Sequence, residues 1–550
     1  MTRAADRLVE TIRAHGLDRI FCVPGESYLS LLDALHGSDI DLVVCRHEGG
    51  AGFMAVADAR LTGRAGLAAV SRGPGATNAS IAVHLANQDA VPLVLLVGQV
   101  ARFERGRGAF QEVDYQQMFG GMAKGIWEVT EAERLSETFA RAVHVAESGT
   151  PGPVILAMPE DMLGDTVSDP TVPAMPVARA SASQDDARKA ADMLAKAERP
   201  LLVAGGRLDT PHGRAALRKT AEAHGIPVGL TFKYQHIFDN SHPLYAGHLG
   251  FKIPPVQVRE MQKADLIIAV GTRLGDTPTQ GYRLPRAPVP EQPLIHVYPD
   301  ADAIGRVFRT DLGIAADPAS FLDALAQLNQ AVPEARRGWA GTLNTVARKL
   351  AGQAPGDWED GIDFGAVVIA LADQAPDDSI VITDSGNFSS WVHCHWPWDG
   401  TQTAIGAVGG AMGLAVPAAV AACLRHPDKR VIAYVGDGGA MMTGNELATA
   451  VSVGAKPVIV VSNNATYGTI RLHQEKGFPG RISGTGLTNP DFAAWGRAFG
   501  ALGVTISKGD DVAARIAAAL AHDGPVVIQV NSSTEAISAY ISISQIRDRA

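Results

Sequence analysis

Two short β-branched runs, Val431–Val435 and Pro457–Val461, stand on either side of a helix-length segment at 444–453. Strands joined through a helix in this way run parallel and lie close together in one sheet. The first run stops at a glycine turn that holds Asp437, and the second stops at Asn464. Parallel α/β sheets bind ligands just past the carboxyl ends of their strands. The pattern therefore predicts an open α/β sheet in which Asp437 and Asn464 converge on one ligand.

The residues at this point suit a metal ion and a diphosphate. A carboxylate, an amide and a backbone oxygen from the loop can bind Mg²⁺, whose octahedron is usually completed by phosphate oxygens and water. Gly436, Gly438 and Gly439 let the backbone come close to a phosphate, and the following helix points its positive end at it. A Gly-Asp-Gly sequence alone also fits any tight turn. The prediction therefore depends on its pairing with Asn463-Asn464.

The size and charge of the chain exclude several classes of function. The 550 residues allow about three or four domains, and 46% hydrophobic and 19% charged residues are typical of a globular protein. The net charge is −10 with Lys and Arg scattered, so nucleic acid and anionic membranes are not expected as partners. No apolar run is long enough to span a membrane, and the N-terminus has the pattern of an amphipathic helix rather than a signal peptide. The dispersed cysteines are expected to be reduced thiols of a cytoplasmic protein: Cys22, Cys45, Cys394 and Cys423.

Alternating helix and strand patterns divide the chain into three doubly wound α/β domains with parallel sheets. The first domain is expected at 1–165, the second at 184–335 and the third at 362–550. The Pro-, Ser- and Ala-rich segment 166–183 is expected to be a linker, and residues 336–361 a second boundary. The closing residues of the chain are expected to be peripheral.

Glycine-rich motifs follow the expected strands of the first and third domains. They are RHEGGAG, GPGATN and GAFQEVD in the first domain, and GGAMGLAVPAA, GDGG and NN in the third. In this order the motifs resemble those of the thiamine diphosphate (ThDP) enzymes, in the group of pyruvate oxidase, acetolactate synthase and benzaldehyde lyase. The resemblance covers the whole chain and implies a pyrimidine-binding, a central and a diphosphate-binding domain.

The resemblance changes the interpretation of Glu48. By position alone, Glu48 is an acid at a helix N-terminus, where the helix dipole favours it without any further function. By resemblance, it is the catalytic glutamate that hydrogen-bonds the aminopyrimidine ring of ThDP and relays a proton. The other cofactor-binding residues implied are Ser385, Gly386, Asn387, Gly410, Met412, Gly436, Asp437, Gly438, Gly439 and Asn464. The metal ligands implied for Mg²⁺ are Asp437, Asn464 and the carbonyl of Thr466.

The cofactor implies decarboxylation of a 2-oxo acid, followed by protonation of the remaining fragment or its addition to an acceptor carbonyl. Phe110 and Gln111 resemble residues that line the pocket of acetolactate synthase, so carboligation is the first interpretation. Gly49 departs from the glutamine usual in acetolactate synthases, and His473 stands where they carry a tryptophan. The candidate substrate residues are Arg72, Phe110, Gln111, Ile470 and His473.

Several alternatives stay open at this point. Arg72 is either a contact to a substrate carboxylate or a solvated loop residue. The reaction could also be a benzaldehyde lyase-type cleavage, a simple 2-oxo acid decarboxylation or an oxidation. The absence from the sequence of an adjacent histidine pair argues against simple aldehyde release. A catalytically silent ThDP-binding subunit is disfavoured because Glu48, Asp437 and Asn464 are all present.

The resemblance also implies an assembly and bears on further cofactors. In the family, the glutamate and the metal site meet across a subunit interface, so a homodimer is expected at least, with a homotetramer as its common extension. FAD is not expected, because Arg273-Leu-Gly-Asp-Thr replaces the Arg-Phe-Asp-Asp-Arg-like sequence of flavin-binding relatives. His393 and His395 fit an aromatic pocket wall or, in an extended segment, a transition-metal site without an evident second ligand cluster.

Overall fold

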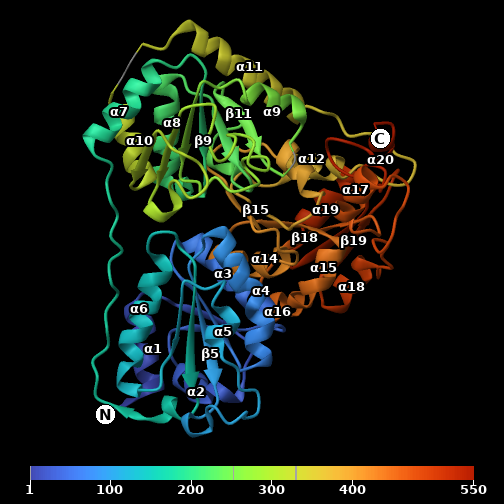
Figure 1. The fold of residues 1–550 in the computed structure, drawn as a ribbon. Helices are drawn as coiled ribbons and strands as arrows, with labels where there is room; N and C mark the ends of the chain where they lie inside the picture. The colour runs from blue at the N-terminus through green and yellow to red at the C-terminus, as the bar shows by residue number, and fades with distance from the viewer. Residues whose placement is uncertain (1, 252, 329–330, 550) are drawn as a thin grey trace.

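The computed structural model describes residues 2–251, 253–328 and 331–549. Within these ranges the chain forms three six-stranded sheets, and the paired strands of each sheet run parallel (Figure 1). The predicted fold class, three doubly wound α/β domains with parallel sheets, is confirmed. None of the helices described in these ranges combines the length and the apolar character needed to cross a bilayer.

The N-terminal domain is the blue lower part of Figure 1, and its sheet has the strand order β3-β2-β4-β5-β7-β6. Its strands are β2 (Arg19–Cys22), β3 (Asp41–Val44), β4 (Gly66–Val70), β5 (Leu93–Gln99), β6 (Gly125–Glu128) and β7 (Pro153–Pro159). Its helices are α1 (Ala4–Ala14), α2 (Leu29–Leu35), α3 (Glu48–Thr62), α4 (Pro74–Asp89), α5 (Tyr115–Phe119) and α6 (Leu135–Glu147). A separate antiparallel pair joins β1 (Thr2–Arg3) to β8 (Thr166–Val167), so the domain reaches slightly past residue 165.

The central domain is the green and yellow upper part, and its sheet has the order β11-β10-β9-β12-β13-β14. Its strands are β9 (Pro200–Ala204), β10 (Val228–Thr231), β11 (Tyr245–Leu249), β12 (Leu266–Val270), β13 (Leu294–Tyr298) and β14 (Leu312–Ala315). Its helices are α7 (Gln184–Ala195), α8 (Pro211–His224), α9 (Pro255–Met261), α10 (Pro318–Ala326) and α11 (Glu334–Ala351).

The C-terminal domain is the orange and red part, and its sheet has the order β16-β15-β17-β18-β20-β19. Its strands are β15 (Ile380–Thr383), β16 (Thr403–Gly406), β17 (Val431–Gly436), β18 (Val458–Asn463), β19 (Leu502–Ile506) and β20 (Val526–Asn531). Its first helices are α12 (Phe364–Gln374), α13 (Ser389–His395), α14 (Ala415–Arg425), α15 (Asp437–Thr443) and α16 (Leu447–Ser452). The remaining ones are α17 (Gly468–Gly477), α18 (Phe492–Ala498), α19 (Val512–Leu520) and α20 (Ile543–Arg547).

The N- and C-terminal sheets share one strand order. Numbered from the first sheet strand of each domain, both read 2-1-3-4-6-5. The central sheet reads 3-2-1-4-5-6, the order common in dinucleotide-binding sheets. The two outer domains therefore share a topology that differs from that of the central domain.

Helix α3 joins the two outer domains. It packs against the N-terminal sheet and against α14, and residues 49–59 are all buried. One hydrophobic core contains side chains from α3, α4, α14 and β17. Gly52 permits the close contact with α4, because a Cβ there would lie 2.4 Å from the Cβ of Ala82. Since apolar residues occur on every side of α3, it needs both domains to be covered.

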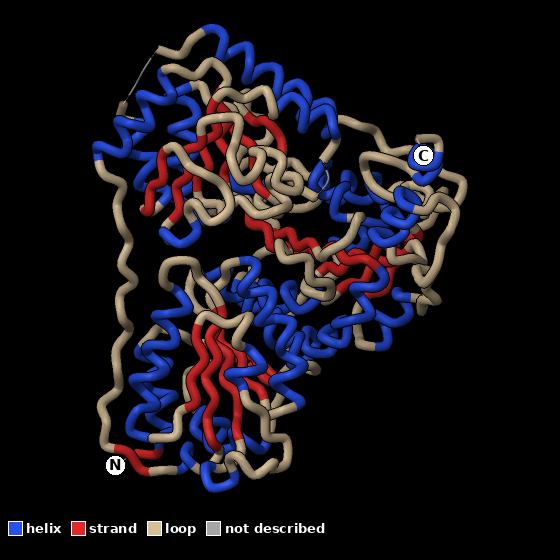
Figure 2. Tube along the Cα trace, viewed as in Figure 1, coloured by secondary structure: helices blue, strands red, loops and turns tan. Residues whose placement is uncertain are grey.

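The two segments expected to separate the domains agree only in part with the structure. Residues 168–183, all described, contain no helix or strand and run as an extended loop between the first two domains (Figure 2). Helix α11 packs on β11, and its buried Arg336 donates hydrogen bonds to the carbonyls of Leu194, Ala197 and His224. This helix therefore belongs with the central domain, which extends beyond residue 335.

Three local expectations are wrong. The helix after β17 begins at Asp437 rather than near 444, because the Gly-Asp-Gly sequence runs directly into a helical turn. His393–His395 ends helix α13 and is not extended. The closing residues are not peripheral, because Ile543 and Ile546 pack with Leu472 of α17 in a small core.

Candidate active site

Asp437 and Asn464 follow the ends of two hydrogen-bonded neighbours, β17 and β18, as the sequence predicts. The Asn489 side chain links the two strand ends. Its Nδ2 donates to Asp437 Oδ2 and to Asn463 Oδ1, both at 2.8 Å. The Thr466 N–H donates to Asn464 Oδ1 at 3.3 Å, which folds the loop after β18 back towards the strand end. Asn489, far along the chain from both motifs, was not predicted.

The Asp437 carboxylate is buried, and it accepts hydrogen bonds from amide groups. Its Oδ1 accepts from the Gly438 N–H at 2.8 Å, and the backbone of Ala465 and Thr466 also bonds to it. Burial raises its pKa, and these hydrogen bonds oppose the rise. Every hydrogen-bond partner of this carboxylate in the described ranges is an amide N–H without a positive charge. A buried carboxylate in such surroundings is stabilised by a cation, and a carboxylate, an amide and a loop carbonyl fit Mg²⁺.

Asp384 connects the loops around this point and was not predicted, although it directly precedes Ser385 at a predicted strand end. Its carboxylate accepts from the Gly413 N–H at 2.8 and 3.0 Å and from the Ser385 N–H at 2.8 Å. A Cβ on Gly439 would lie 2.6 Å from Asp384 Oδ2. Burial raises the pKa of Asp384 to about 6. One carboxylate thus joins the Ser385 and Met412 loops and lies against helix α15 at Gly439.

The loop after β15 offers groups for an anion. The Ser385 hydroxyl is buried without a hydrogen-bond partner in the described chain. The Asn387 side chain donates to the Gly468 carbonyl and accepts from the Thr469 hydroxyl, both at 3.1 Å. A Cβ on Gly438 would lie 2.4 Å from the Tyr467 ring, so only glycine fits there. Gly386, Gly436 and Gly439 complete the small-residue lining of these strand ends.

The loop that holds Gly410 and Met412 is fixed from the N-terminal domain. Asp89 is buried, and its carboxylate accepts from the Gly409 N–H at 2.6 Å and from the Val408 N–H at 3.1 Å. Gly410 has φ +76°, a conformation that favours glycine. Asp89 therefore sets the conformation of a loop in a different domain.

Glu48 is the first residue of α3, and its Oε2 accepts from Asn78 Nδ2 at 2.9 Å. Both residues belong to the N-terminal domain. No contact described within this one chain joins Glu48 to Asp437 or to the Ser385 loop. The two halves of the predicted site therefore lie on different domains and are separate within one chain.

Arg72 is buried rather than solvated, and its hydrogen bonds are to groups of the N-terminal domain. Its guanidinium donates to Glu26 Oε1 at 2.7 Å, to Glu160 Oε2 at 2.8 Å and to the Phe110 carbonyl at 3.3 Å. Phe110 is 74% exposed, and the neighbouring Gln111 has φ +64°. The solvated-loop alternative is therefore wrong, because Arg72 is buried and holds the loop of Phe110 and Gln111. Its contact to a substrate carboxylate stays a prediction.

Ile470 and His473 lie one turn apart on α17, so their side chains share one face of the helix. Ile470 is 53% exposed. The His473 ring meets the Phe251 ring of the central domain edge to face, with centroids 6.2 Å apart. Phe251 was not predicted, because its contact with α17 crosses a domain boundary.

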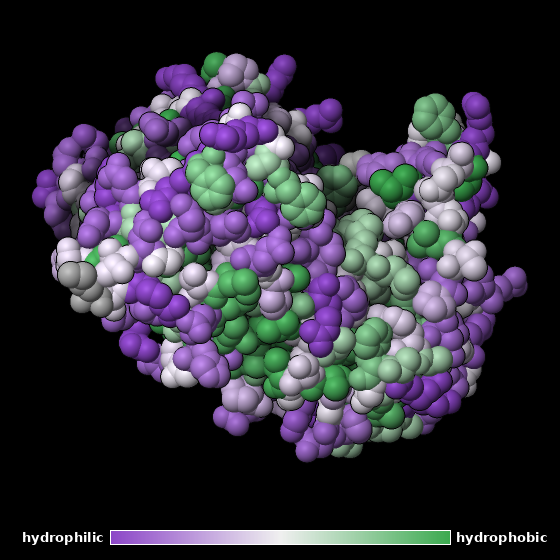
Figure 3. Space-filling model, turned by 90° about the horizontal axis from the view of Figure 1, so that it is seen from below, coloured by the Kyte–Doolittle hydropathy of each residue, from purple (hydrophilic) through white to green (hydrophobic). Residues whose placement is uncertain are grey.

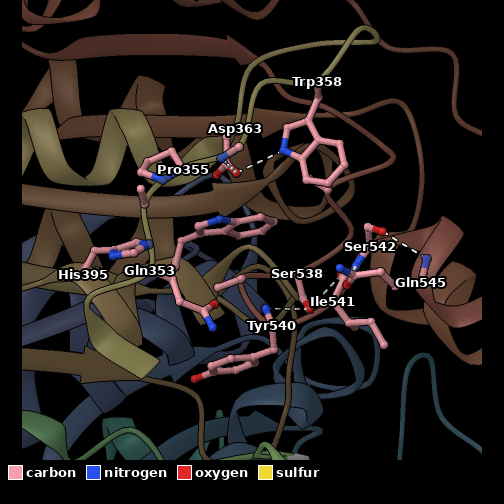
Figure 4. A pocket seen from close by; sticks show the side chains of 15 residues that line it. Gln353, Pro355, Trp358, Asp363, His395, Ser538, Tyr540, Ile541, Ser542 and Gln545 are labelled. Carbon is pink, nitrogen blue, oxygen red and sulfur yellow. Dashed lines mark hydrogen bonds between the residues drawn. The ribbon is translucent and has the colours of Figure 1, made fainter. Parts of the chain in front are cut away.

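A cavity of about 400 Å³ lies between the segment before α12, helix α13 and the closing residues (Figure 4). Trp391, His395 and Tyr540 line it, and the Trp358 indole N–H donates to Asp363 Oδ2 at 3.1 Å on one wall. None of its lining residues is a predicted cofactor or substrate residue. His395 lines the wall of this cavity, and within the described ranges no three His, Cys, Asp or Glu side chains are placed to hold a metal.

Comparisons with known proteins cover nearly the whole chain. Residues 2–118, 187–325 and 384–530 match the N-terminal TPP binding, central and C-terminal TPP binding domains of thiamine pyrophosphate enzymes. The chain is 33% identical over 544 residues to the acetolactate synthase large subunit of Parasynechococcus marenigrum, covering 96% of this chain and 87% of that protein. It is 32% identical over 535 residues to the acetolactate synthase isozyme 2 large subunit of Escherichia coli, covering 96% and 95%.

A solved structure of a thiamine diphosphate-dependent enzyme also matches this chain. The Rhodococcus jostii thiamine diphosphate-dependent 4-hydroxybenzoylformate decarboxylase superposes with a TM-score of 0.83 at 25% identity, covering 97% of this chain and 99% of that chain. The sequence resemblance is thus confirmed by three domains in the same order and by relatives above 30% identity over nearly the whole length. This chain belongs to the thiamine diphosphate-dependent enzymes.

Proposed function

We propose that the enzyme decarboxylates a 2-oxo acid with ThDP and Mg²⁺ and joins the remaining fragment to an acceptor carbonyl, as an acetolactate synthase does. The observation that carries the proposal is the buried Asp437 carboxylate, whose hydrogen-bond partners among the described residues are all amides and which follows the strand next to that of Asn464. The acetolactate synthase large subunits, similar over 96% of this chain, support the ligation step.

The residues present fit the cofactor. Asp437, Asn464 and the Thr466 carbonyl would hold Mg²⁺, and the unpartnered Ser385 hydroxyl would bind a diphosphate oxygen. Gly386, Asn387, Gly436, Gly438 and Gly439 would line the diphosphate, and Gly410 and Met412 the pyrimidine. When bound, ThDP supplies a thiazolium ring that accepts the electron pair left by decarboxylation.

Glu48 would hold and transfer a proton at its Oε1 or Oε2. Asn78 bonds Oε2 at 2.9 Å and orients the carboxyl group, which leaves Oε1 for the aminopyrimidine. A Cβ on Gly75 would approach Oε1 to 3.4 Å, so the glycine keeps the space beside it open. Glu48 would therefore be the general acid–base of the site.

A homodimer would complete the site. Within one chain Glu48 and Asp437 belong to different domains and share no described contact, so a second copy is proposed to bring Glu48 to the metal site. Exposed apolar side chains support this assembly, and Figure 3 shows apolar groups gathered on one face of the molecule. Such side chains on α4, α15 and α16 are Ile81, Met441, Met442 and Val451. Pairing of two dimers into a homotetramer is the expected extension.

FAD is not proposed as a cofactor, because protein side chains occupy part of the edge at the strand ends of the central sheet. A Cβ on Gly206 would lie 2.3 Å from the Tyr234 ring, so that ring covers the end of β9. Arg273 donates a hydrogen bond to the Gln88 carbonyl of the N-terminal domain. Flavin absorbance in stoichiometric amount in freshly purified enzyme would refute this part of the proposal.

Simple decarboxylation is the second candidate. It is favoured by the similarity in fold to the 4-hydroxybenzoylformate decarboxylase over 97% of the chain. Product analysis separates the two. The enzyme is incubated with ThDP, Mg²⁺ and aliphatic or aryl 2-oxo acids, with and without an acceptor carbonyl, and products are identified by mass. Acyloin or 2-hydroxy acid products support carboligation, aldehyde alone supports decarboxylation, and cleavage of added acyloins would support a lyase.

A further inference from the structure

Lys233 is a buried lysine that the proposed mechanism does not use. It follows β10 of the central domain, is 3% exposed and has φ +67°, a conformation that non-glycine residues rarely adopt. Its side chain points out of its own domain. Nζ donates to Thr383 Oγ1 at 2.9 Å and to the Asp384 carbonyl at 3.1 Å, at the end of β15.

This contact is part of a close packing between two domains. A Cβ on Gly406, at the end of β16, would lie 2.6 Å from Lys233 Cδ, so glycine makes room for the lysine chain. Nζ also lies 5.1 Å from the centre of the Phe232 ring. The strand end that Lys233 contacts continues directly into Ser385, Gly386 and Asn387. A central-domain side chain thus contacts the strand end at which the proposed diphosphate loop begins.

The charged groups around Lys233 do not neutralise it by direct contact. Asp384 and Asp89 attract the ammonium and Arg60 repels it, but no carboxylate is ion-paired with it in the described part of the chain. The neighbouring imidazoles of His248 and His393 are buried, and burial lowers the pKa of both, so they are neutral at pH 7. Burial likewise lowers the pKa of Lys233 to about 7.

We propose that Lys233 is a positioning residue for the diphosphate of ThDP: it fixes the Thr383–Asp384 strand end and places a positive charge at the backbone that leads into Ser385. The inference rests on the proposed function, because it assumes that the loop after β15 binds the diphosphate. It adds a role for the central domain, which otherwise contributes no cofactor residue.

The proposal makes binding of ThDP dependent on a proton. A diphosphate favours the charged form of a nearby lysine and raises its pKa. A lysine that is partly neutral in the free protein therefore takes up a proton when ThDP binds. The affinity should be highest below pH 7 and fall as the pH rises above it, because protonation then costs more of the binding free energy.

The test measures ThDP binding to apoenzyme with Mg²⁺ by titration calorimetry between pH 6 and pH 9. Each titration is run in two buffers of different ionisation enthalpy, which gives the number of protons taken up. The variants are Lys233→Met, which removes the charge, and Lys233→Arg, which keeps a charge that does not titrate. Lys219→Met, at an exposed position on α8, is the matched control. Ionisation of ThDP itself is common to all four proteins and cancels in the comparison.

We expect the dissociation constant of ThDP to rise at least about tenfold at pH 7 in Lys233→Met. The proton that Lys233 takes up in the wild type when ThDP binds should be missing in both Lys233 variants. At pH 9, Lys233→Arg should bind ThDP more tightly than Lys233→Met. Thermal unfolding of each apoenzyme reports whether the fold survives. If Lys233→Met does not fold, Lys233→Arg alone still tests proton uptake, and Thr383→Val tests the contact by weakening binding of ThDP.

Failure of this inference and failure of the proposed function give different results. If the wild-type protein does not bind ThDP, the proposed function is wrong. If it binds ThDP but the Lys233 variants have wild-type affinity and proton uptake, Lys233 only fills space between the domains. Equal loss of affinity in Lys219→Met would also overturn the assignment.

Discussion

The buried carboxylate of Glu446 in the C-terminal domain accepts a hydrogen bond from the backbone N–H of His47 at 3.0 Å. It also accepts from the Arg46 N–H at 3.1 Å and from the Thr449 hydroxyl at 2.6 Å. His47 is the N-cap of α3, and Glu48 is its first residue. The C-terminal domain therefore fixes the turn that presents Glu48.

Because Glu48 is held in this way, Glu48→Gln should remove a proton-transfer group without moving the backbone. The amide oxygen can still accept from Asn78, so fold and metal site should survive. Turnover should fall about 10²–10⁴-fold, with a much smaller loss of ThDP affinity. Exchange of the ThDP C2 proton, followed by NMR after quenching, measures the affected step, with Glu137→Gln on α6 as the control. Wild-type exchange in Glu48→Gln would remove Glu48 from the mechanism.

Asp437→Ala should abolish the dependence of ThDP binding on Mg²⁺. The reason is that the variant loses the only carboxylate among the proposed metal ligands. In the wild type, saturation at a hundredfold excess over the dissociation constant should stabilise the fold by about 2.7 kcal/mol, visible as a higher Tm. The variant should show no such shift, whereas Asp428→Ala, at an exposed loop position, should behave as wild type. Unchanged ThDP affinity in Asp437→Ala would disprove the metal assignment.

Arg72→Met should loosen the loop that carries Phe110 and Gln111, because the Arg72 guanidinium bonds the Phe110 carbonyl. Hydrogen exchange of residues 108–114 should become faster. The KM for the 2-oxo acid should rise severalfold while ThDP affinity stays near that of wild type. Since Glu26 is 64% exposed, the loss of unfolding free energy should be only about 1–2 kcal/mol. An unchanged exchange rate and KM would show that Arg72 has no role in this loop.

His473→Trp should favour smaller aliphatic 2-oxo acids over aryl ones. The indole would fill space beside Phe251, whose ring centre lies 6.2 Å from that of His473. Differences of one methylene in a pocket correspond to about 1–3 kcal/mol, so the ratio of kcat/KM values should change tens-fold at most. If the ratio for the two substrate classes stays the same, His473 lies outside the substrate pocket.

Acid should detach the closing segment of the chain before the rest unfolds. Buried Glu475 accepts from Arg547 Nη2 at 2.6 Å and from Arg471 Nε at 3.0 Å, and the hydrogen bonds with Arg547 lower its pKa to about 2. A folded pKa below the unfolded value gives stability that is complete above about pH 4.3 and is lost as the pH falls towards 2. Limited proteolysis near α20 should therefore begin in this window.

The matched variant is Glu475→Gln, which removes the titrating group. It should show the increased proteolysis already at pH 7 and lose its dependence on acid. If cleavage near α20 has the same pH profile in both proteins, the Glu475–Arg547 pair does not hold the segment.

The sequence was sufficient to predict the three parallel sheets and the position of the metal-binding candidates at their strand ends. Buried parallel strands are apolar throughout and stop at glycine turns, so their ends, and with them Asp437 and Asn464, can be located from pattern alone. The helical nature of His393–His395 could not be predicted, because its side chains are buried on several sides and leave no alternation of polar and apolar residues.

The residues that could not be predicted from the sequence contact partners that are far away in the sequence. Asp89 fixes a loop near residue 409, Glu446 fixes the turn before Glu48, and Lys233 contacts Thr383. Each is a single charged residue whose partner is set by domain packing rather than by local pattern. The role of Arg72 was missed for the same reason, since Glu26 and Glu160 meet it only in the folded domain.

The burial of α3 between two domains has a consequence for the growing chain. More than three hundred residues separate the end of α3 at Thr62 from the beginning of α14 at Ala415. At translation rates of about 5–20 residues per second, roughly 20–70 s pass before α14 is synthesised and can pack on the apolar outer side of α3. During that time the nascent N-terminal domain exposes this apolar side of α3 to solvent and can bind other apolar surfaces.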